Sequence, residues 1–324
     1  MAHGSTPLVT ILTPAHNRAD YLPETIESVL GQSYTNIEYI VLDDGSTDDT
    51  PQVLASYRDR IAWVTHPNMG EARTVNRGLK LAKGEFIGVV NSDDPILPGL
   101  VEIAVEELIH HPGVLVVYPD WVLIDPESRP VKTVFAHDYD YLDMLRWHHC
   151  IPGPGAMFRR RALELGGYRD ETYRYVGDFE FWLRVGLHGP FLRIARPLAT
   201  FRMHPLSASL SDRGELMAEE HVRLVREYFA RGDLPERAKH AQREVLAAAY
   251  FTAGAICLLS ARSVARGYMV RALQAHPLSF LRWSKRGWLV RVLATLLPDF
   301  AYSRVRALWR KVGGGAPIWF EESP

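Results

Sequence analysis

The first half of the chain alternates between two kinds of segment, and this alternation limits the possible folds more than any other feature. Short runs of β-branched and apolar residues occupy Leu8–Leu12, Ile37–Leu42, Ile61–Val64, Phe86–Val90 and Val114–Tyr118. Between these runs, apolar residues recur every three or four positions, which is the spacing of a helix with one buried face. Runs of this composition are typical of strands that are buried on both faces. The sequence therefore predicts an α/β fold with a mostly parallel sheet flanked by helices.

Polar residues follow each of the first four predicted strands. The four segments are Thr13–Arg18, Asp43–Asp48, His66–Gly70 and Asn91–Asp94. In open parallel sheets, ligands bind outside the carboxyl ends of the strands, so these segments are expected to form the site. The chain contains neither G-x-G-x-x-G after the first strand nor G-x-x-x-x-G-K-[ST]. Dinucleotide dehydrogenases and P-loop nucleotidases are therefore disfavoured.

Carboxylates at neighbouring strand ends repel one another unless a cation or hydrogen-bond donors lie between them. A divalent metal ion bound with a nucleotide diphosphate provides such a cation. Asp93, together with Asp94, offers hard oxygen ligands for Mg²⁺ or Mn²⁺. Asp43 or Asp44 would accept hydrogen bonds from a base or a ribose. The alternative for the segment that begins at Asp44 is an ordinary turn with a helix N-cap.

The motifs, taken together and in order, resemble those of the inverting glycosyltransferases of family 2. They are Thr13-Pro14-Ala15-His16-Asn17-Arg18, Asp43-Asp44-Gly45-Ser46-Thr47-Asp48, Asn68-Met69-Gly70 and Asn91-Ser92-Asp93-Asp94, with Arg202-Met203-His204-Pro205 at the end. The resemblance covers residues 8 to about 205. It implies the GT-A fold, in which a Rossmann-like sheet binds a nucleotide diphosphate sugar with Mn²⁺ or Mg²⁺.

The resemblance also implies roles for individual residues of the donor site. The residues it places around the nucleotide are Thr13, Pro14, Asn17, Asp43, Asp44, Asn68, Asn91 and Ser92. Asn91-Ser92-Asp93 stands at the D-x-D motif of the family, with Asn in place of the first acid, and leaves Asp93 as the main metal ligand. Arg73 would hold a phosphate or the donor sugar, or it would be a solvent-facing helix residue.

A second acidic motif, Gly177-Asp178-Phe179-Glu180, resembles the family segment that carries the general base. Asp178 matches the base, which removes a proton from the acceptor hydroxyl during direct displacement. The alternative role for Asp178 is a helix N-cap. Glu180 is the poorer candidate because Arg184 follows four residues later on the same helical face, which predicts a surface ion pair.

Three further parts of the site rest on the same resemblance. His204 would complete the metal site or approach the diphosphate, or it would be an ordinary loop residue. Trp121 and Asp125 would line the donor sugar. Trp182 is included in the donor or acceptor pocket, and packing roles explain such aromatic residues almost as well.

The charges of the chain are divided unevenly along its length. Residues 1–261 hold 26 basic and 35 acidic side chains, whereas residues 262–312 hold 11 basic and one acidic. Basic residues lie beside Trp and Leu at helical spacing in residues 278–312, which suits a helix in the headgroup region of an anionic membrane. The alternatives are a basic helix docked on the acidic domain or a contact between copies in a homo-oligomer. No nucleic-acid partner is expected.

Cysteine usage and the absence of a secretory signal favour a cytoplasmic protein. Cys150 and Cys257 are the only two cysteines and do not form a disulfide framework. The apolar stretch Val245–Ala261 is too short and alanine-rich for a membrane span. We therefore expect a peripheral protein on the cytoplasmic face of the inner membrane.

The predicted domain organisation follows these composition changes. Residues 1–7 are expected to be disordered or an expression remnant, and residues 8–212 form the catalytic domain, with a donor half (8–118) and an acceptor half (119–212). Residues 213–312 form a helical region with a basic end, and residues 313–324 form a flexible tail.

The predicted function is a metal-dependent inverting glycosyltransferase of cell-surface glycan synthesis. It would use a UDP-sugar and a saccharide or lipid-linked acceptor, with the uridine taken from the resemblance alone. The alternatives are a sugar-phosphate nucleotidyltransferase and a catalytically impaired binder of nucleotide sugars. The sequence identifies neither the donor sugar nor the acceptor.

Overall fold

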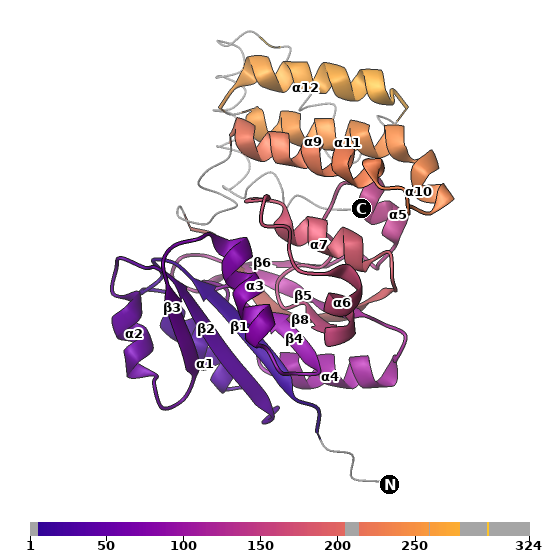
Figure 1. Cartoon of the computed structure of the whole chain (residues 1–324). Helices are drawn as coiled ribbons and strands as arrows, with labels where there is room; N and C mark the ends of the chain where they lie inside the picture. The colour runs from indigo at the N-terminus through magenta and orange to yellow at the C-terminus, as the bar shows by residue number, and fades with distance from the viewer. Residues whose placement is uncertain (1–5, 205–213, 259, 279–296, 298–324) are drawn as a thin grey trace. The chain divides into compact units, whose positions relative to one another are not determined.

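The computed structural model describes residues 6–204, 214–258, 260–278 and 297 and divides into two compact units (Figure 1). The first unit comprises Met1–Tyr141 and Cys150–Leu210, and the second comprises Leu142–His149 and Ser211–Pro324. A short segment from the middle of the chain therefore belongs to the second unit. The predicted membrane segment, residues 278–312, lies outside the described residues except for its first residue and Leu297.

The N-terminal part of the first unit is a set of four parallel strands. They are β1 (Val9–Ala15), β2 (Ile37–Asp44), β3 (Ala62–His66) and β4 (Phe86–Val89). β1 pairs with β2 on one side and β4 on the other, and β3 pairs with β2. Because all four run in the same direction, their carboxyl ends meet at one edge of the sheet. The predicted α/β fold with a mostly parallel sheet is confirmed.

The second half of the sheet consists of β5 (Val116–Ile124), β6 (Pro130–Val134), β7 (Met157–Arg159) and β8 (Phe191–Arg202). The predicted run Val114–Tyr118 covers the start of β5, whereas the sequence did not predict β6, β7 and β8. β7 lies antiparallel between β4 and β5, β6 is antiparallel to β5, and β8 pairs with β5 in parallel. This arrangement brings the end of β8 to the segment that follows β4, where the backbone N–H of Leu97 donates to the carbonyl of Leu198 at 2.9 Å.

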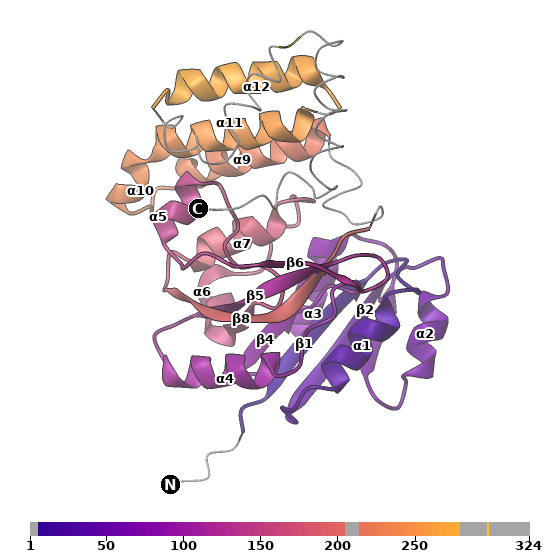
Figure 2. The same cartoon turned by 180° about the vertical axis from the view of Figure 1, so that it is seen from behind.

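Helices cover both faces of this sheet (Figures 1 and 2). α1 (Leu22–Leu30), α2 (Thr50–Ser56) and α4 (Leu100–His110) contribute to the core on one face. α3 (Glu71–Leu81), α6 (Arg160–Gly166) and α7 (Gly177–Val185) lie on the other. These helices leave the carboxyl edge of β1 to β4 to the connecting loops.

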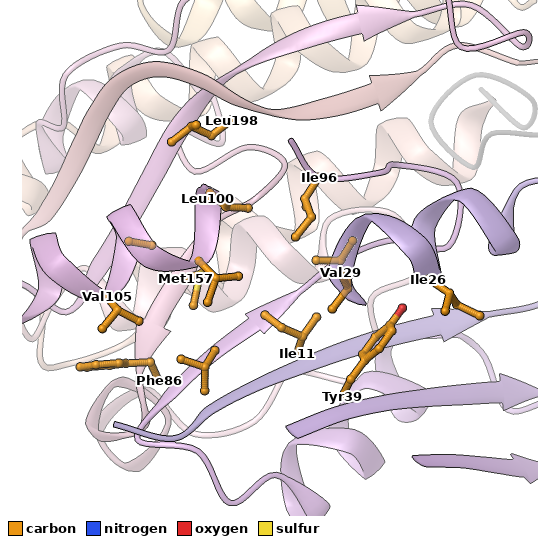
Figure 3. Packing of buried hydrophobic residues seen from close by; sticks show 14 of the residues in the cluster. Ile11, Ile26, Val29, Tyr39, Phe86, Ile96, Leu100, Val105, Met157 and Leu198 are labelled. Atoms are coloured by element: carbon orange, nitrogen blue, oxygen red, sulfur yellow. The ribbon is translucent and has the colours of Figure 1, made fainter. Parts of the chain in front are cut away.

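The core between the sheet and α1 and α4 is apolar and fully enclosed. Ile11, Val29, Phe86 and Leu100 are each at most 1% exposed, and Figure 3 shows their side chains pointing toward one another from strands and helices. Burying such side chains stabilises the fold by roughly 1.5–3 kcal/mol each. This packing fixes the directions of β1 and β4, and with them the position of the loops that follow.

The second unit is helical in its described part. It contains α9 (Glu215–Ala230), α10 (Glu236–His240), α11 (Gln242–Cys257), α12 (Arg262–Ala275) and most of α5 (Tyr141–Arg146). Small residues allow the close helix packing, since a side chain at Gly254 would meet Met269 of α12 at 2.9 Å. The α5 segment is held within this unit by an ion pair between Arg146 and Glu244, at 3.2 Å. No helix in the described ranges is long and apolar enough to cross a membrane.

Gly84 lies in the connection that leads into β4. It provides a test of how tightly the chain is packed beside the amino ends of β1 and β4. A Cβ at Gly84 would lie 2.4 Å from the backbone nitrogen of Thr10 and 2.6 Å from the carbonyl oxygen of Phe86. Because backbone cannot move aside as a flexible side chain can, we expect Gly84→Ala to lower the free energy of unfolding by about 1–3 kcal/mol.

The matched control is Gly113→Ala, where an added Cβ meets nothing within 4 Å. Denaturant unfolding of both variants measures the difference. Equal stabilities for the two variants would contradict the packing described at Gly84.

Candidate active site

The loops that follow β1 and β2 are hydrogen-bonded to each other through Asn17. The Asn17 Oδ1 accepts from the backbone N–H of Thr47 at 2.8 Å, and the Asn17 N–H donates to Ser46 Oγ at 2.9 Å. Asn17 has a φ of 53°, a left-handed conformation that asparagine adopts more readily than most residues. The asparagine of the first motif therefore fixes the shape of the loop.

Asp44 is fully used in holding the loop between β3 and α3. Its two carboxylate oxygens accept from the backbone N–H groups of Met69 and Gly70, at 2.7 and 2.9 Å. His66 Nδ1 also lies 3.5 Å from Asp44 Oδ1. Asp44 is buried and positions the backbone beside the site, so little of it remains available to a ligand.

Asp43 differs from its neighbour because one of its oxygens has no partner. Its Oδ1 accepts from the backbone N–H of Ser46 at 3.0 Å, while the buried Oδ2 has no hydrogen-bond partner among the described residues. An unsatisfied buried carboxylate oxygen calls for an explanation, and a ligand donor is a direct one. Of the two aspartates that the sequence left open, the geometry favours Asp43 for the nucleotide.

The other predicted nucleotide residues differ in how accessible they are. Thr13 and Pro14 are buried in β1, and the Thr13 hydroxyl lies 3.1 Å from the Tyr39 hydroxyl. Asn68 is exposed, and its Nδ2 lies 3.2 Å from Nδ1 of His16. His16 received no role from the sequence, although it lies within the first motif. Its exposed ring also contacts the Asp44 carbonyl at 2.8 Å and so joins the three loops.

Asp93 forms the centre of a charged cluster at the end of β4. Its Oδ2 lies 2.9 Å from His204 Nε2 and accepts from Arg18 Nε at 3.1 Å. Burial has the largest influence on the pKa of Asp93 and raises it, but the hydrogen bond from His204 and the positive charge of Arg18 outweigh it and lower the pKa. Asp93 is therefore held as a carboxylate.

Asp94 faces away from this cluster into the protein. Its Oδ1 accepts from the backbone N–H of Arg202 at 2.7 Å, and its Oδ2 accepts from Asn91 Nδ2 at 3.0 Å. Burial, followed by the negative charge of Asp93, raises the pKa of Asp94 to about 8. Ser92 is buried, and its carbonyl accepts from the Thr25 hydroxyl at 3.1 Å. Asp94 and Ser92 thus stabilise the loop, and the geometry favours Asp93 as the ligand.

Asp93 and His204 are suited to bind a hard divalent cation whose remaining ligands come from a bound phosphate and from water. Asp93 and His204 offer a carboxylate and an imidazole nitrogen in contact with each other. Within the described ranges, no group of three or more His, Cys, Asp or Glu side chains could hold a metal ion. Two protein ligands are sufficient where phosphate oxygens and water complete the coordination, as is common for Mg²⁺.

Arg73 and Asp178 lie on the other face of the sheet, on α3 and α7. Arg73 is 56% exposed at its side chain and pairs with Glu171 at 3.2 Å. Asp178 is exposed in the first turn of α7, where its Oδ1 accepts from the N–H of Phe179 at 2.7 Å. Burial of Cys150, and then the negative charge of Asp178, raise the pKa of the Cys150 thiol, so these two side chains are neighbours.

The predicted ion pair of Glu180 is confirmed. Its carboxylate accepts from Arg184 Nη2 at 2.7 Å, one helical turn later. Glu180 is therefore occupied, whereas Asp178 presents its carboxylate to solvent at the start of the same helix.

Two of the three predicted pocket residues, Trp182 and Asp125, have structural contacts. Trp182 is buried among the rings of Phe158, Phe181 and Phe191, which places it in the core instead of a pocket wall. Asp125 accepts from the backbone N–H of Arg129 at 2.8 Å and stabilises the turn between β5 and β6. Trp121 is 7% exposed, and its indole N–H has no partner among the described residues.

Comparison with known proteins gives a consistent result. Residues 10–166 match the family model described as Glycosyl transferase family 2. An uncharacterized glycosyltransferase of Rickettsia typhi is 32% identical over 198 residues, which cover 59% of this chain and 60% of that protein. The chondroitin synthase of Escherichia coli is 28% identical over 233 residues, covering 69% of this chain and 33% of that protein. The chain thus spans no more than about 60% of these relatives.

Solved structures of similar fold match most of the chain, including residues of both units. S. aureus TarS 1-349 in complex with UDP-GlcNAc has a TM-score of 0.67 and 19% identity, covering 94% of this chain and 92% of that chain. The mannosyltransferase PcManGT of Pyrobaculum calidifontis, in complex with GDP-Man and Mn²⁺, has a TM-score of 0.55 and 20% identity. It covers 94% of this chain and 88% of that chain.

The contrast between Asp43 and Asp44 leads to a stability prediction. In Asp44→Asn, the side-chain NH₂ would face the backbone N–H of Met69 or Gly70, so one buried hydrogen bond is lost and two donors oppose each other. We expect this substitution to lower the free energy of unfolding by about 1–3 kcal/mol, measured by denaturant titration.

Asp43→Asn is the control, because its amide can occupy the position of the unpartnered Oδ2 while Oδ1 still accepts from Ser46. We expect Asp43→Asn to cost less stability than Asp44→Asn. The reverse order would show that Asp43 is the residue holding the loops.

Proposed function

Because the chain contains a domain of glycosyl transferase family 2, we propose that it transfers a sugar from a nucleotide diphosphate sugar to an acceptor hydroxyl, with inversion. The observation that carries this proposal is the pairing of two features at one sheet edge. Asp43 has an unpartnered buried oxygen at the end of β2, and Asp93 contacts His204 at the end of β4. The Asp43 oxygen can accept a hydrogen bond from an N–H or O–H group of a nucleotide. The Asp93–His204 pair can bind a cation that is also bound to a diphosphate.

The nucleotide would bind over the loops after β1, β2 and β3. Asp43 Oδ2 would accept a hydrogen bond from the base or ribose, and the exposed His16 and Asn68 would border the same space. We propose a uridine nucleotide because TarS, the more similar of the two solved structures described above, holds UDP-GlcNAc. The family resemblance of the loop motifs points the same way.

Asp93 and His204 would hold a Mn²⁺ or Mg²⁺ ion with the donor diphosphate. When bound, such an ion neutralises the negative charge that develops on the departing nucleotide diphosphate. Arg18 already contacts the Asp93 carboxylate and would lie beside the phosphate oxygens. Asn91, which is exposed, keeps its Oδ1 available for a ribose hydroxyl while its Nδ2 donates to Asp94.

Asp178 would act as the general base. Inversion by direct displacement needs one carboxylate that takes the proton of the acceptor hydroxyl as its oxygen attacks the anomeric carbon. The Asp178 carboxylate is exposed in the first turn of α7, where an acceptor can reach it. Glu180 is less suited because Arg184 already binds it.

The acceptor and the cellular location are proposed on less direct grounds. Similarity to the E. coli chondroitin synthase supports a saccharide acceptor and a role in glycan synthesis. The basic residues of 278–312 support a lipid-linked acceptor at the cytoplasmic face of the inner membrane.

The donor class is tested by a thermal-shift screen over nucleotides and nucleotide sugars, with and without Mn²⁺. We expect UDP and UDP-sugars with Mn²⁺ to raise the Tm most, since a ligand that binds only the folded state stabilises it by mass action. Release of UDP and free sugar from the donor would support a transferase. Release of pyrophosphate from a nucleoside triphosphate and a sugar phosphate would instead indicate a nucleotidyltransferase.

The base assignment is tested with Asp178→Asn, which removes the proton acceptor and retains the side-chain shape. We expect kcat for transfer to fall by about 10²–10⁴-fold, with the Kd for UDP nearly unchanged. Glu180→Gln is the control on the same helix and should retain most of the activity. Wild-type turnover by Asp178→Asn would overturn the assignment.

A further inference from the structure

Arg202, the last residue of β8, is buried to an unusual degree for a charged side chain. Its side chain has no exposed area, and it is the largest of the fully buried side chains. Burying a guanidinium without partners is strongly unfavourable, so its hydrogen bonds are the key to its role. Each of its three nitrogens donates to an oxygen of the surrounding protein.

These oxygens come from three segments that are far apart in the sequence. Arg202 Nε donates to the backbone carbonyl of Asp93 at 2.9 Å. Nη1 donates to the turn between β5 and β6, at 3.1 Å to the carbonyl of Pro126 and 2.9 Å to the hydroxyl of Ser128. Nη2 donates to Glu24 of α1 at 2.6 Å. One side chain thus connects the candidate metal ligand to two separate elements of the first unit.

Tyr21 extends this connection to the second candidate ligand. The guanidinium of Arg202 lies over the Tyr21 ring, 4.8 Å from its centroid, and the ring of His204 lies 4.7 Å from the same ring. The backbone N–H of Arg202 also donates to Asp94 at 2.7 Å. Arg202 therefore contacts Asp93 directly, through its carbonyl, and His204 indirectly, through the ring of Tyr21.

A contribution to folding stability does not by itself explain a buried arginine with these partners. Well-packed apolar residues can often replace buried charged groups without lowering the stability of a protein. Hydrogen bonds behind a metal ligand, in contrast, fix its orientation and strengthen its binding. We propose that Arg202 is a positioning residue, which holds Asp93 and His204 in the geometry that binds a cation with the donor diphosphate. This inference rests on the function proposed above and adds a residue to it.

The test compares Arg202→Lys with Arg160→Lys as a matched control. Arg160 also donates to several backbone carbonyls, those of Ala82 and Gly84, but these precede β4 at the opposite edge of the sheet. Isothermal titration measures the affinity for Mn²⁺ in the presence of UDP and the affinity for UDP without metal. We expect Arg202→Lys to weaken Mn²⁺ binding by about 10–100-fold and to change metal-free UDP binding by less than about twofold.

A second measurement needs no ligand and uses hydrogen exchange of the amides of residues 91–94. We expect faster exchange there in Arg202→Lys than in Arg160→Lys. If Arg202→Lys does not fold, Glu24→Gln removes the charge of an acceptor that is 45% exposed. It should weaken Mn²⁺ binding in the same direction by a smaller factor.

Three results would overturn the proposal. The first is an Mn²⁺ affinity of Arg202→Lys within about twofold of that of the wild type. The second is an equal loss of Mn²⁺ affinity in both lysine variants, in proportion to their loss of Tm. The third is an unchanged rate of hydrogen exchange at the amides of residues 91–94. A wild-type protein that binds no nucleotide with or without Mn²⁺ would instead remove the proposed function itself. Nucleotide binding by the wild type with unchanged metal affinity in Arg202→Lys would remove only the role of Arg202.

Discussion

The candidate site depends on how the protein compensates the negative charges of two pairs of adjacent aspartates at one edge of its sheet. β2 ends in Asp43 and Asp44, and the segment after β4 carries Asp93 and Asp94. In each pair the second carboxylate accepts two hydrogen bonds within the protein and stabilises a loop. The first keeps an unpartnered oxygen in the case of Asp43, and contacts with Arg18 and His204 in the case of Asp93. Each strand end thus combines a structural acid with one that can serve a ligand.

This division of roles requires contacts from distant parts of the chain. Asp44 is held by the loop before α3, whereas Asp94 is held by the end of β8, more than 100 residues later. The parallel pairing of β8 with β5, and the antiparallel β7 between β5 and β4, bring that end into place. The contact between Asp93 and His204 therefore depends on the second half of the sheet as much as on the parallel half.

The sequence predicted the parts of the fold that have local signals. The apolar runs located β1 to β4 within a few residues, and the motifs after them lie at the carboxyl edge of these strands, as the sequence predicted. β6 and β7 were missed because they are short, and β6 carries exposed and polar residues. The assignment of Leu142–His149 to the helical unit has no composition signal, since α5 has six residues and depends on long-range contacts. Likewise, only coordinates could distinguish Asp43 from Asp44, place Trp182 in the core, or reveal the burial of Arg202.

Two positions depart from the family pattern, and the structure distinguishes them. Asn91 replaces the first acid of the D-x-D motif, and its Nδ2 donates to the buried Asp94. A carboxylate at this position would face Asp94 Oδ2 at about the same distance, and two neighbouring acids would oppose each other's ionisation. The substitution of Asn91 for an acid is therefore explained by the repulsion that it avoids. It does not alter the contact between Asp93 and His204. Gly177 replaces an acid where an added Cβ would have its nearest neighbour at 3.8 Å, so space does not require glycine there. Nothing in the structure explains that substitution, and it leaves Asp178 as the acid of this motif at the start of α7.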